Sequence, residues 1–276
     1  MTNISARSML APFALGLLAL SCGPSAGPAG PPTHAIYQMQ DVQKSWQADP
    51  ADSTKEVWVS FHYPQFTAAP GAAAVDSLNE WVRLRLLRSA PADTMPASLD
   101  ALAASLIADY RTFRERNPSS RLVGWFFEGE IAVTWDSLGV VTLDAVSDGY
   151  TGGAHGFSAR TLAMFDATTG RRLGIADLVR PDALEALAGL AESEFRGVRR
   201  LAPDAKLDQE GFWFEGGRFR LNDNAGLGAH GLTFYYNDYE IAPHSMGPTE
   251  VRIEWAELRP LLRADGPLGA FARGKV

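Results

Sequence analysis

The pattern of apolar and polar residues has a two-residue period where the folded part of the chain begins. Within residues 56–66, the apolar side chains of Val57, Val59 and Phe61 occupy every second position. Such alternation predicts a β-strand that buries one face. Pro64 predicts the end of this strand, because proline lacks the amide hydrogen that a central strand donates.

Three longer segments have the helical period instead, with an apolar residue at every third or fourth position. The first predicted helix begins after Gly71, the second is closed by Asn117-Pro118, and the third opens at Pro181. A short helix over residues 256–263 is expected near the end. The expected buried stripes are Val75, Leu78, Val82 and Leu86 in the first helix, Leu99, Leu102, Leu106, Tyr110 and Phe113 in the second, and Leu184, Leu187, Ala191, Phe195 and Val198 in the third.

Short β-branched and aromatic segments, separated by glycine-containing turns, predict further strands. They are residues 122–127, 130–135, 140–146, 161–166, 212–214, 218–221, 232–236 and 251–255. We expect the pair 212–214 and 218–221 to form a hairpin around Gly216-Gly217. This order of elements predicts an α+β fold, an antiparallel or mixed β-sheet packed against a few helices in two consecutive subdomains, residues 46–156 and 157–276.

The first residues have the pattern of an export signal. Arg7 precedes an apolar run over residues 9–20, which is too short to span a membrane, and Leu18-Ala19-Leu20-Ser21-Cys22 resembles a lipobox. We expect a signal peptide over residues 1–21, lipidation of Cys22, and a glycine- and proline-rich tether over residues 22–45. An ordinary signal peptide with an incidental cysteine is the alternative.

Composition and charge limit the classes of partner that this chain is expected to bind. Cys22 is the only cysteine, so no disulfide is expected, and lipidation explains its position. The formal net charge is −7, and it becomes −8 without residues 1–21, which hold Arg7 and no acid. An acidic chain argues against nucleic acid as the partner. We expect an exported, membrane-anchored lipoprotein, in the outer membrane and periplasm if the host is Gram-negative.

The glycine-rich segment from Tyr150 to Gly156 is the first candidate site. Gly152 and Gly153 allow positive φ and close backbone approach, and His155 is a possible base, metal ligand or partner contact. The structural alternative is a tight turn in which His155 bonds to neighbouring backbone. No Gly-x-Ser-x-Gly nucleophile motif occurs in the predicted folded part, residues 46–276, so no catalytic residue is assigned.

The segment from Tyr239 to Gly247 is the second candidate. We expect Tyr239 and Ile241 to be buried and Pro243 to set the bend, while Glu240 either pairs with an arginine or contacts a partner. His244 in this segment and His230 in Gly228-Ala229-His230-Gly231 would form a metal site only if both converged with His155. No metal or other cofactor is therefore expected.

Motifs in both segments resemble the RsiV/PdaC-type extracytoplasmic domain pair, over roughly residues 56–263. In chain order they are Tyr63-Pro64-Gln65-Phe66 with Asn79, Tyr150-Thr151-Gly152-Gly153-Ala154-His155, Phe165-Asp166 with Thr169-Gly170, Asp177-Leu178, residues 232–236, Tyr239-Glu240-Ile241-Ala242-Pro243, Gly247 and Leu258. In RsiV-type anti-sigma factors the domain senses lysozyme, and in PdaC-type deacetylases it precedes a catalytic domain.

The resemblance implies a non-catalytic envelope domain that binds a cationic lysozyme-like muramidase or peptidoglycan. The sequence shows neither a sigma-binding segment with a transmembrane helix nor a deacetylase domain. The expected contact residues are Tyr150, Gly152, Gly153, His155, Tyr239, Glu240 and Pro243. Two alternatives remain: a small envelope hydrolase or metal-dependent enzyme that uses His155, and a structural envelope lipoprotein without a small ligand.

Overall fold

The computed structural model describes residues 31–89, 95–118, 120 and 123–275. Cys22 and the predicted signal peptide, residues 1–21, lie outside the described residues. Within the described part, no helix is long and apolar enough to cross a membrane. Residues 31–276 form one compact unit with its own hydrophobic cores, so we expect this unit to fold by itself.

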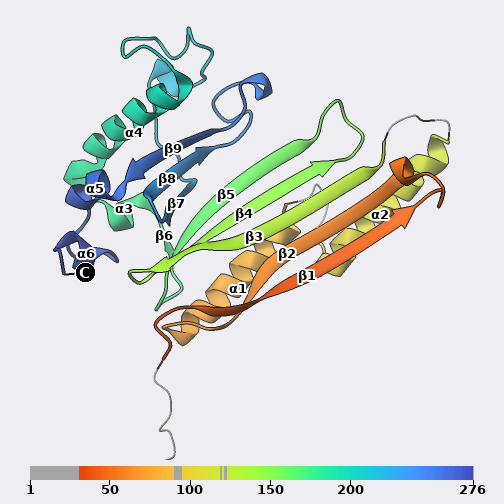
Figure 1. Cartoon of the computed structure of the whole chain (residues 1–276), viewed down its shortest axis with the longest axis horizontal. Helices are drawn as coiled ribbons and strands as arrows, with labels where there is room; N and C mark the ends of the chain where they lie inside the picture. The colour runs from red at the N-terminus through yellow and green to blue at the C-terminus, as the bar shows by residue number, and fades with distance from the viewer. Residues whose placement is uncertain (1–30, 90–94, 119, 121–122, 276) are drawn as a thin grey trace, which may run out of the picture. The chain divides into compact units, whose positions relative to one another are not determined.

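A six-stranded mixed sheet forms the first layer (Figure 1), and its strands follow one another in chain order. They are β1 (Ile36–Gln47), β2 (Glu56–Ala68), β3 (Trp125–Ser137), β4 (Val140–Tyr150), β5 (Phe157–Asp166) and β6 (Arg172–Leu173). Neighbouring strands are antiparallel except β2 and β3, which are parallel. A parallel pair needs a crossover, which is supplied here by α1 (Ala72–Leu87) and α2 (Leu99–Arg116).

Both crossover helices cover the same face of this sheet (Figure 1). The alternate residues Val59 and Phe61 of β2 and Phe127 of β3 point to the helices and are buried in one core with Leu78 and Leu102. The predicted period-two strand and the first two predicted helices are therefore confirmed. Asn79, which belongs to the motif pattern, has a structural role, because its side-chain amide bonds to both the N–H and the carbonyl of Phe66.

A smaller antiparallel sheet follows, made of β7 (Ala225–Gly228), β8 (Gly231–Tyr236) and β9 (Thr249–Glu254). The third predicted helix is present as α4 (Leu184–Arg199), which packs on β9. Short helical turns connect the remaining parts. They are η1 (Ser53–Lys55), α3 (Ile175–Leu178), η2 (Pro181–Ala183), η3 (Glu215–Gly217), η4 (His244–Met246), α5 (Trp255–Leu258), η5 (Arg259–Leu261) and α6 (Gly269–Ala272). The mixed α+β fold with two subdomains is thus confirmed.

The small sheet packs on the face of the large sheet that the helices leave free. Gly226 of β7 lies so close to β4 and β5 that an added Cβ would be 2.8 Å from Thr142 Cγ2 and 3.2 Å from Leu162 Cβ. Thr142 and Leu162 alternate with Leu143 and Ala163, which belong to the helix-side core. Glycine at this position is what permits the close approach of the two sheets.

Three predicted elements were wrong in their details. The predicted strands 122–127 and 130–135 are the single strand β3, because Gly129 makes no turn. Its missing Cβ gives room to Phe61 and Leu86, whose atoms would lie 2.9 and 3.1 Å away. The predicted hairpin 212–221 is absent among the described residues, and Phe212, Phe214 and Phe219 instead surround the ring of Phe195. Val198, expected in the buried stripe of α4, is 47% exposed.

Three boundaries also differ from the expected ones. Strand β1 begins at Ile36, so residues 36–45 of the predicted tether, residues 22–45, belong to a strand. The predicted subdomain boundary between residues 156 and 157 falls between β4 and β5, which pair in the same sheet. Pro64 does not end β2, since β2 pairs only with β1 at that point and the missing N–H breaks no bond to β3.

Candidate functional site

The two candidate loops, far apart in the sequence, meet at the surface. One is the β4–β5 connection, residues 151–156, and the other joins β8 to β9. The imidazoles of His155 and His244 stack with centroids 4.5 Å apart, and the Tyr239 ring lies 5.7 Å from His244 and 6.4 Å from His155. All three side chains are exposed. We call this group the ring stack.

Local backbone requirements explain the glycine-rich loop. Gly152 has φ +90°, and a Cβ there would lie 3.0 Å from the indole nitrogen of Trp125. Gly153 has no such restriction, because the nearest atom to its Cβ position is 3.6 Å away. Gly152 therefore shapes the turn and Gly153 does not need to be glycine for that reason. Tyr150 is half-buried at the end of β4, beside the loop and outside the ring stack.

The loop after β8 holds its rings in a constrained conformation. Tyr239 is 56% exposed, contrary to expectation, and adopts φ +62°, which is unfavourable for a side chain of this size. Ile241 is buried as expected, and Pro243 precedes the turn η4 at φ −63°. The carboxylate of Glu240 pairs with no arginine of the described residues. It accepts hydrogen bonds from Asn237 N at 2.8 Å and Asn222 Nδ2 at 2.7 Å, so it braces the loop.

Hydrogen bonds fix the neutral tautomers of both histidines. His155 Nδ1 lies 2.7 Å from Gly156 O, and His244 Nδ1 lies 2.9 Å from Asp238 Oδ2. A carbonyl and a carboxylate only accept, so each Nδ1 is the donor and each neutral ring has its lone pair on Nε2. The hydroxyl of Tyr239 lies 3.4 Å from His155 Nε2. Asp238 Oδ1 is buried and has no hydrogen-bond partner among the described residues, which leaves one more acceptor beside the rings.

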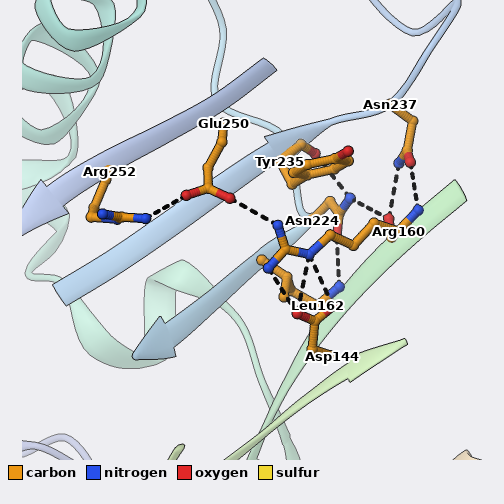
Figure 2. Close-up of polar contacts among 8 residues, drawn as sticks. All are labelled: Asp144, Arg160, Leu162, Asn224, Tyr235, Asn237, Glu250 and Arg252. Atoms are coloured by element: carbon orange, nitrogen blue, oxygen red, sulfur yellow. Dashed lines mark hydrogen bonds and ion pairs between the residues drawn. The ribbon is translucent and has the colours of Figure 1, made fainter. Parts of the chain in front are cut away.

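An ion-pair network beneath the loop anchors it to the large sheet (Figure 2). Arg160 of β5 donates to Asp144 Oδ2 at 2.7 Å and Glu250 Oε2 at 2.8 Å, and its guanidinium lies 4.9 Å from the ring centre of Tyr235. The side-chain hydrogen bond with Asp144 is the main cause that raises the pKa of Arg160 above its ordinary value. The network thus joins β4, β5 and the small sheet.

Two asparagines bond to the backbone of the same strand (Figure 2). Asn237 accepts from Arg160 N at 2.7 Å and donates to Arg160 O at 3.0 Å. Asn224 accepts from Leu162 N at 2.7 Å and also donates to Arg160 O. Asn237 directly precedes the Asp238-Tyr239 pair, so these bonds set the position of the ring stack relative to β5. The sequence analysis did not identify Asn224 and Asn237 as site residues, although Asn237-Asp238 after an apolar strand is a turn signal.

The possible convergence of three histidines does not occur. His230 directly precedes β8, and His244 lies in the loop after β8. The two ends of this six-residue strand are roughly 17–20 Å apart, so the two histidines lie at opposite ends of it. The rings of His155 and His244 are within 12° of parallel, so their lone pairs do not point at a common centre. Within the described part of the chain, no group of three or more His, Cys, Asp or Glu side chains is placed to hold a metal ion.

Comparison with protein families gives a partial match. Residues 176–256, which include Tyr239, Glu240, Pro243 and His244, match the family model described as "Protein of unknown function (DUF3298)". The C-terminal part of the chain therefore contains a DUF3298 domain. No curated protein matches the sequence.

Solved structures with the same fold belong to this family. A DUF3298 family member from Bacteroides fragilis is 22% identical, with a TM-score of 0.62, over 87% of this chain and 98% of that one. A DUF3298 family protein from Pseudomonas aeruginosa is 20% identical, with a TM-score of 0.59, over 84% of this chain and 97% of that one. The likeness extends across both sheets and establishes the fold.

Proposed function

We propose that this chain is a lipid-anchored, non-catalytic binding domain of the cell envelope, which contacts its ligand through the ring stack of His155, Tyr239 and His244. The observation that carries the proposal is the stack itself, in which two loops place three exposed rings side by side. Exposed aromatic rings on a rigid support are typical of contact surfaces, because they bury large areas at a low cost in side-chain entropy.

Peptidoglycan fragments are the ligand class that fits this surface best. The outer ring faces can pack against the apolar faces of sugars, while His244 Nε2 and the tyrosine hydroxyl accept hydrogen bonds from hydroxyl and amide groups. Both kinds of group occur in muropeptides. The resemblance of the loop motifs to a lysozyme-sensing domain also favours a ligand connected with the cell wall.

A lysozyme-like muramidase is the second candidate. It is favoured by the net charge of −7, since an acidic domain attracts a basic protein and increases its association rate. Glu240 is committed to the loop itself, and Asp238, which accepts from His244 Nδ1, is mostly buried. A muramidase would therefore contact the rings and be attracted by the net charge of the domain.

Lipidation of Cys22 would hold the domain at the outer side of a membrane. The lipobox-like residues before Cys22 and the proline-rich segment after it support this part of the proposal. The test is incorporation of a labelled fatty acid in cells that express the full chain. Incorporation of the label by the natural chain and its loss in Cys22→Ser would support lipidation. Export of both chains in equal amounts without any label would refute it.

The ligand test is a calorimetric titration of residues 31–276 with purified muropeptides and, separately, with a c-type lysozyme, at physiological salt. Sub-micromolar binding that weakens at least tenfold in the variant Tyr239→Ala/His244→Ala supports the proposal. Tyr37→Ala is the control, because Tyr37 is an exposed aromatic residue of β1 at 37% exposure. Absence of binding to both ligands would overturn the proposal. Turnover of the muropeptides that depends on His155 would instead establish a hydrolase.

A further inference from the structure

A second surface, on the large sheet, is separate from the ring stack. The helices cover one face of this sheet. On the opposite face the small sheet packs on β5 and on the neighbouring parts of β3 and β4, near Thr142 and Leu162, and the part of that face from β1 to the Asp148 end of β4 stays uncovered (Figure 1). Trp58 of β2 is 37% exposed there, and its ring stacks on Phe126 of β3 with centroids 5.5 Å apart. Beside this pair is a hollow of about 420 Å³.

Carboxylates of the same face lie next to these rings. Glu128 of β3 is directly opposite Asp148 of β4 in the antiparallel register, and Glu130 follows two residues later, on the same face. Glu128 also lines the hollow together with Trp58 and Glu56. Opposite residues of neighbouring strands have Cβ atoms about 4.5–5.5 Å apart, so the two carboxylates repel each other.

The two basic residues nearest to these carboxylates, Lys44 at the hollow and His62 beside Glu130, pair instead with Asp100 and Asp41. Among the ion pairs of the described part, none includes Glu128, Glu130 or Asp148, and Arg160, the nearest arginine in the register of the face, is held by Asp144 and Glu250. A directly opposed pair of like charges destabilises a sheet. The fold keeps this unfavourable pair beside exposed aromatic rings, which is the arrangement that a cationic partner would relieve.

The distribution of these three carboxylates indicates which kind of cation the face could bind. The carboxylates are distributed over two strands and form no three-ligand group of the kind that holds a metal ion within the described residues. Separate ammonium or guanidinium groups can each meet one carboxylate, and a guanidinium can also lie over the Trp58 ring. Several such groups at strand spacing are found together on a basic polypeptide.

We infer that the uncovered face of β1 to β4 binds a basic polypeptide segment, with its arginine or lysine side chains on Glu128, Glu130 and Asp148 and one of them against Trp58. This site does not overlap the ring stack, so it does not rest on the proposed function. It gives the acidic chain a defined contact surface in place of a diffuse charge.

The experiment measures binding of a fluorescent octapeptide of alternating arginine and serine to residues 31–276, at physiological salt. The same peptide with citrulline in place of arginine is the uncharged probe. The test variant is Glu128→Gln/Glu130→Gln/Asp148→Asn. The matched control Glu185→Gln/Glu194→Gln/Asp204→Asn removes the same formal charge from exposed positions outside this face.

We expect the arginine peptide to bind and the citrulline peptide not to bind. The test variant should weaken binding about tenfold or more, and the control less than about threefold, because exposed charges act only at short range at this salt concentration. Trp58→Ala should also weaken binding, while Tyr239→Ala/His244→Ala should not. Equal losses in the two triple variants would show that only net charge matters and would overturn the site, as would binding of the citrulline peptide.

Discussion

The imidazole of His155 and the imidazole of His244 stack face to face, 4.5 Å between centroids and 12° from parallel, although one follows β4 and the other follows β8. Neither ring is held by burial, since both are exposed. Each is oriented by an Nδ1 hydrogen bond, to Gly156 O and to Asp238 respectively. The stack therefore depends on how the two loops are supported, and the predictions below address that support.

Tyr239 has an unfavourable backbone conformation. We predict that a residue better suited to this conformation keeps or increases the stability of the protein but weakens ligand binding. At φ +62°, Tyr239→Asn should leave the free energy of unfolding unchanged or raise it by up to about 1 kcal/mol, because asparagine tolerates the left-handed region. The same change should weaken ligand binding, since the ring is lost. Urea unfolding and calorimetry measure the two effects.

The control for this substitution is Arg200→Asn, an exposed residue at φ +56° at the end of α4. It should give a similar change in stability with no change in ligand affinity. A large loss of stability in Tyr239→Asn would mean that the ring supports the fold.

Gly152 and Gly153 should respond differently to the same substitution. Gly152→Ala should cost about 1–2 kcal/mol, because the residue is at φ +90° and the new Cβ would meet Trp125 at 3.0 Å. Gly153→Ala should change stability by less than about 0.5 kcal/mol, since nothing lies closer than 3.6 Å. Thermal unfolding of the two variants is the measurement, and equal effects would contradict this account of the loop.

Elements that bury one side of a regular pattern were predictable from the sequence. Helices α1 and α4 and strands β2 and β8 each bury a stripe of apolar residues with the period of their type. Strand β1 was not predicted, because it is an edge strand with mostly exposed side chains, so neither face leaves a periodic signal. Strand β7 was missed because it is only four residues long and has two glycines, of which Gly226 is required by packing against the large sheet.

The candidate loops were predictable one by one, but their meeting was not. The glycines of residues 152–156 and Pro243 are local signals that any sequence reading can use. The contact between the loops depends on Asn237, whose side chain bonds to the backbone of Arg160. Such a bond has no period and no fixed spacing, so only the structure reveals it.

Arg160 links the two sheets through its ion pairs with Asp144 and Glu250. Arg160→Met should lower the free energy of unfolding by about 2–4 kcal/mol, because Asp144 has an 11% exposed side chain and would lose its cation. Arg252→Met is the matched control: Arg252 pairs with the same Glu250 but is 44% exposed, so its loss should cost less than about 1 kcal/mol. Chemical denaturation distinguishes the two, and similar losses would contradict the role of burial.

Tyr236 should make the protein sensitive to alkaline pH. Burial, followed by the charge of Glu240, raises the pKa of the Tyr236 phenol above its ordinary value. The folded state therefore favours the neutral phenol, and this contribution is complete below about pH 10, the pKa in the unfolded chain, and is lost as the pH rises from there toward the folded value.

The test is the stability of Tyr236→Phe as a function of pH. The variant should be less stable by about 1 kcal/mol at neutral pH, because the hydroxyl donates to Arg220 O at 2.7 Å. Above pH 10 its stability should fall less steeply than that of the natural chain. Parallel curves up to pH 11 would show that this phenol does not contribute to the alkaline transition.

The opposition of Glu128 and Asp148 gives a prediction about stability that needs no ligand. Glu128→Gln should raise the free energy of unfolding by about 0.2–1 kcal/mol, because it removes one of two like charges that face each other across β3 and β4. The gain should shrink in about 1 M salt, where the repulsion is screened. Glu194→Gln, at an exposed acid of α4 beyond its first turn, should change the free energy of unfolding by less than about 0.5 kcal/mol. If Glu128→Gln is more stable but binds the basic peptide more weakly, the repulsion between the two carboxylates is a cost in stability that accompanies the binding site. A loss of stability would mean that Glu128 has a favourable partner in solution and that the face is not frustrated.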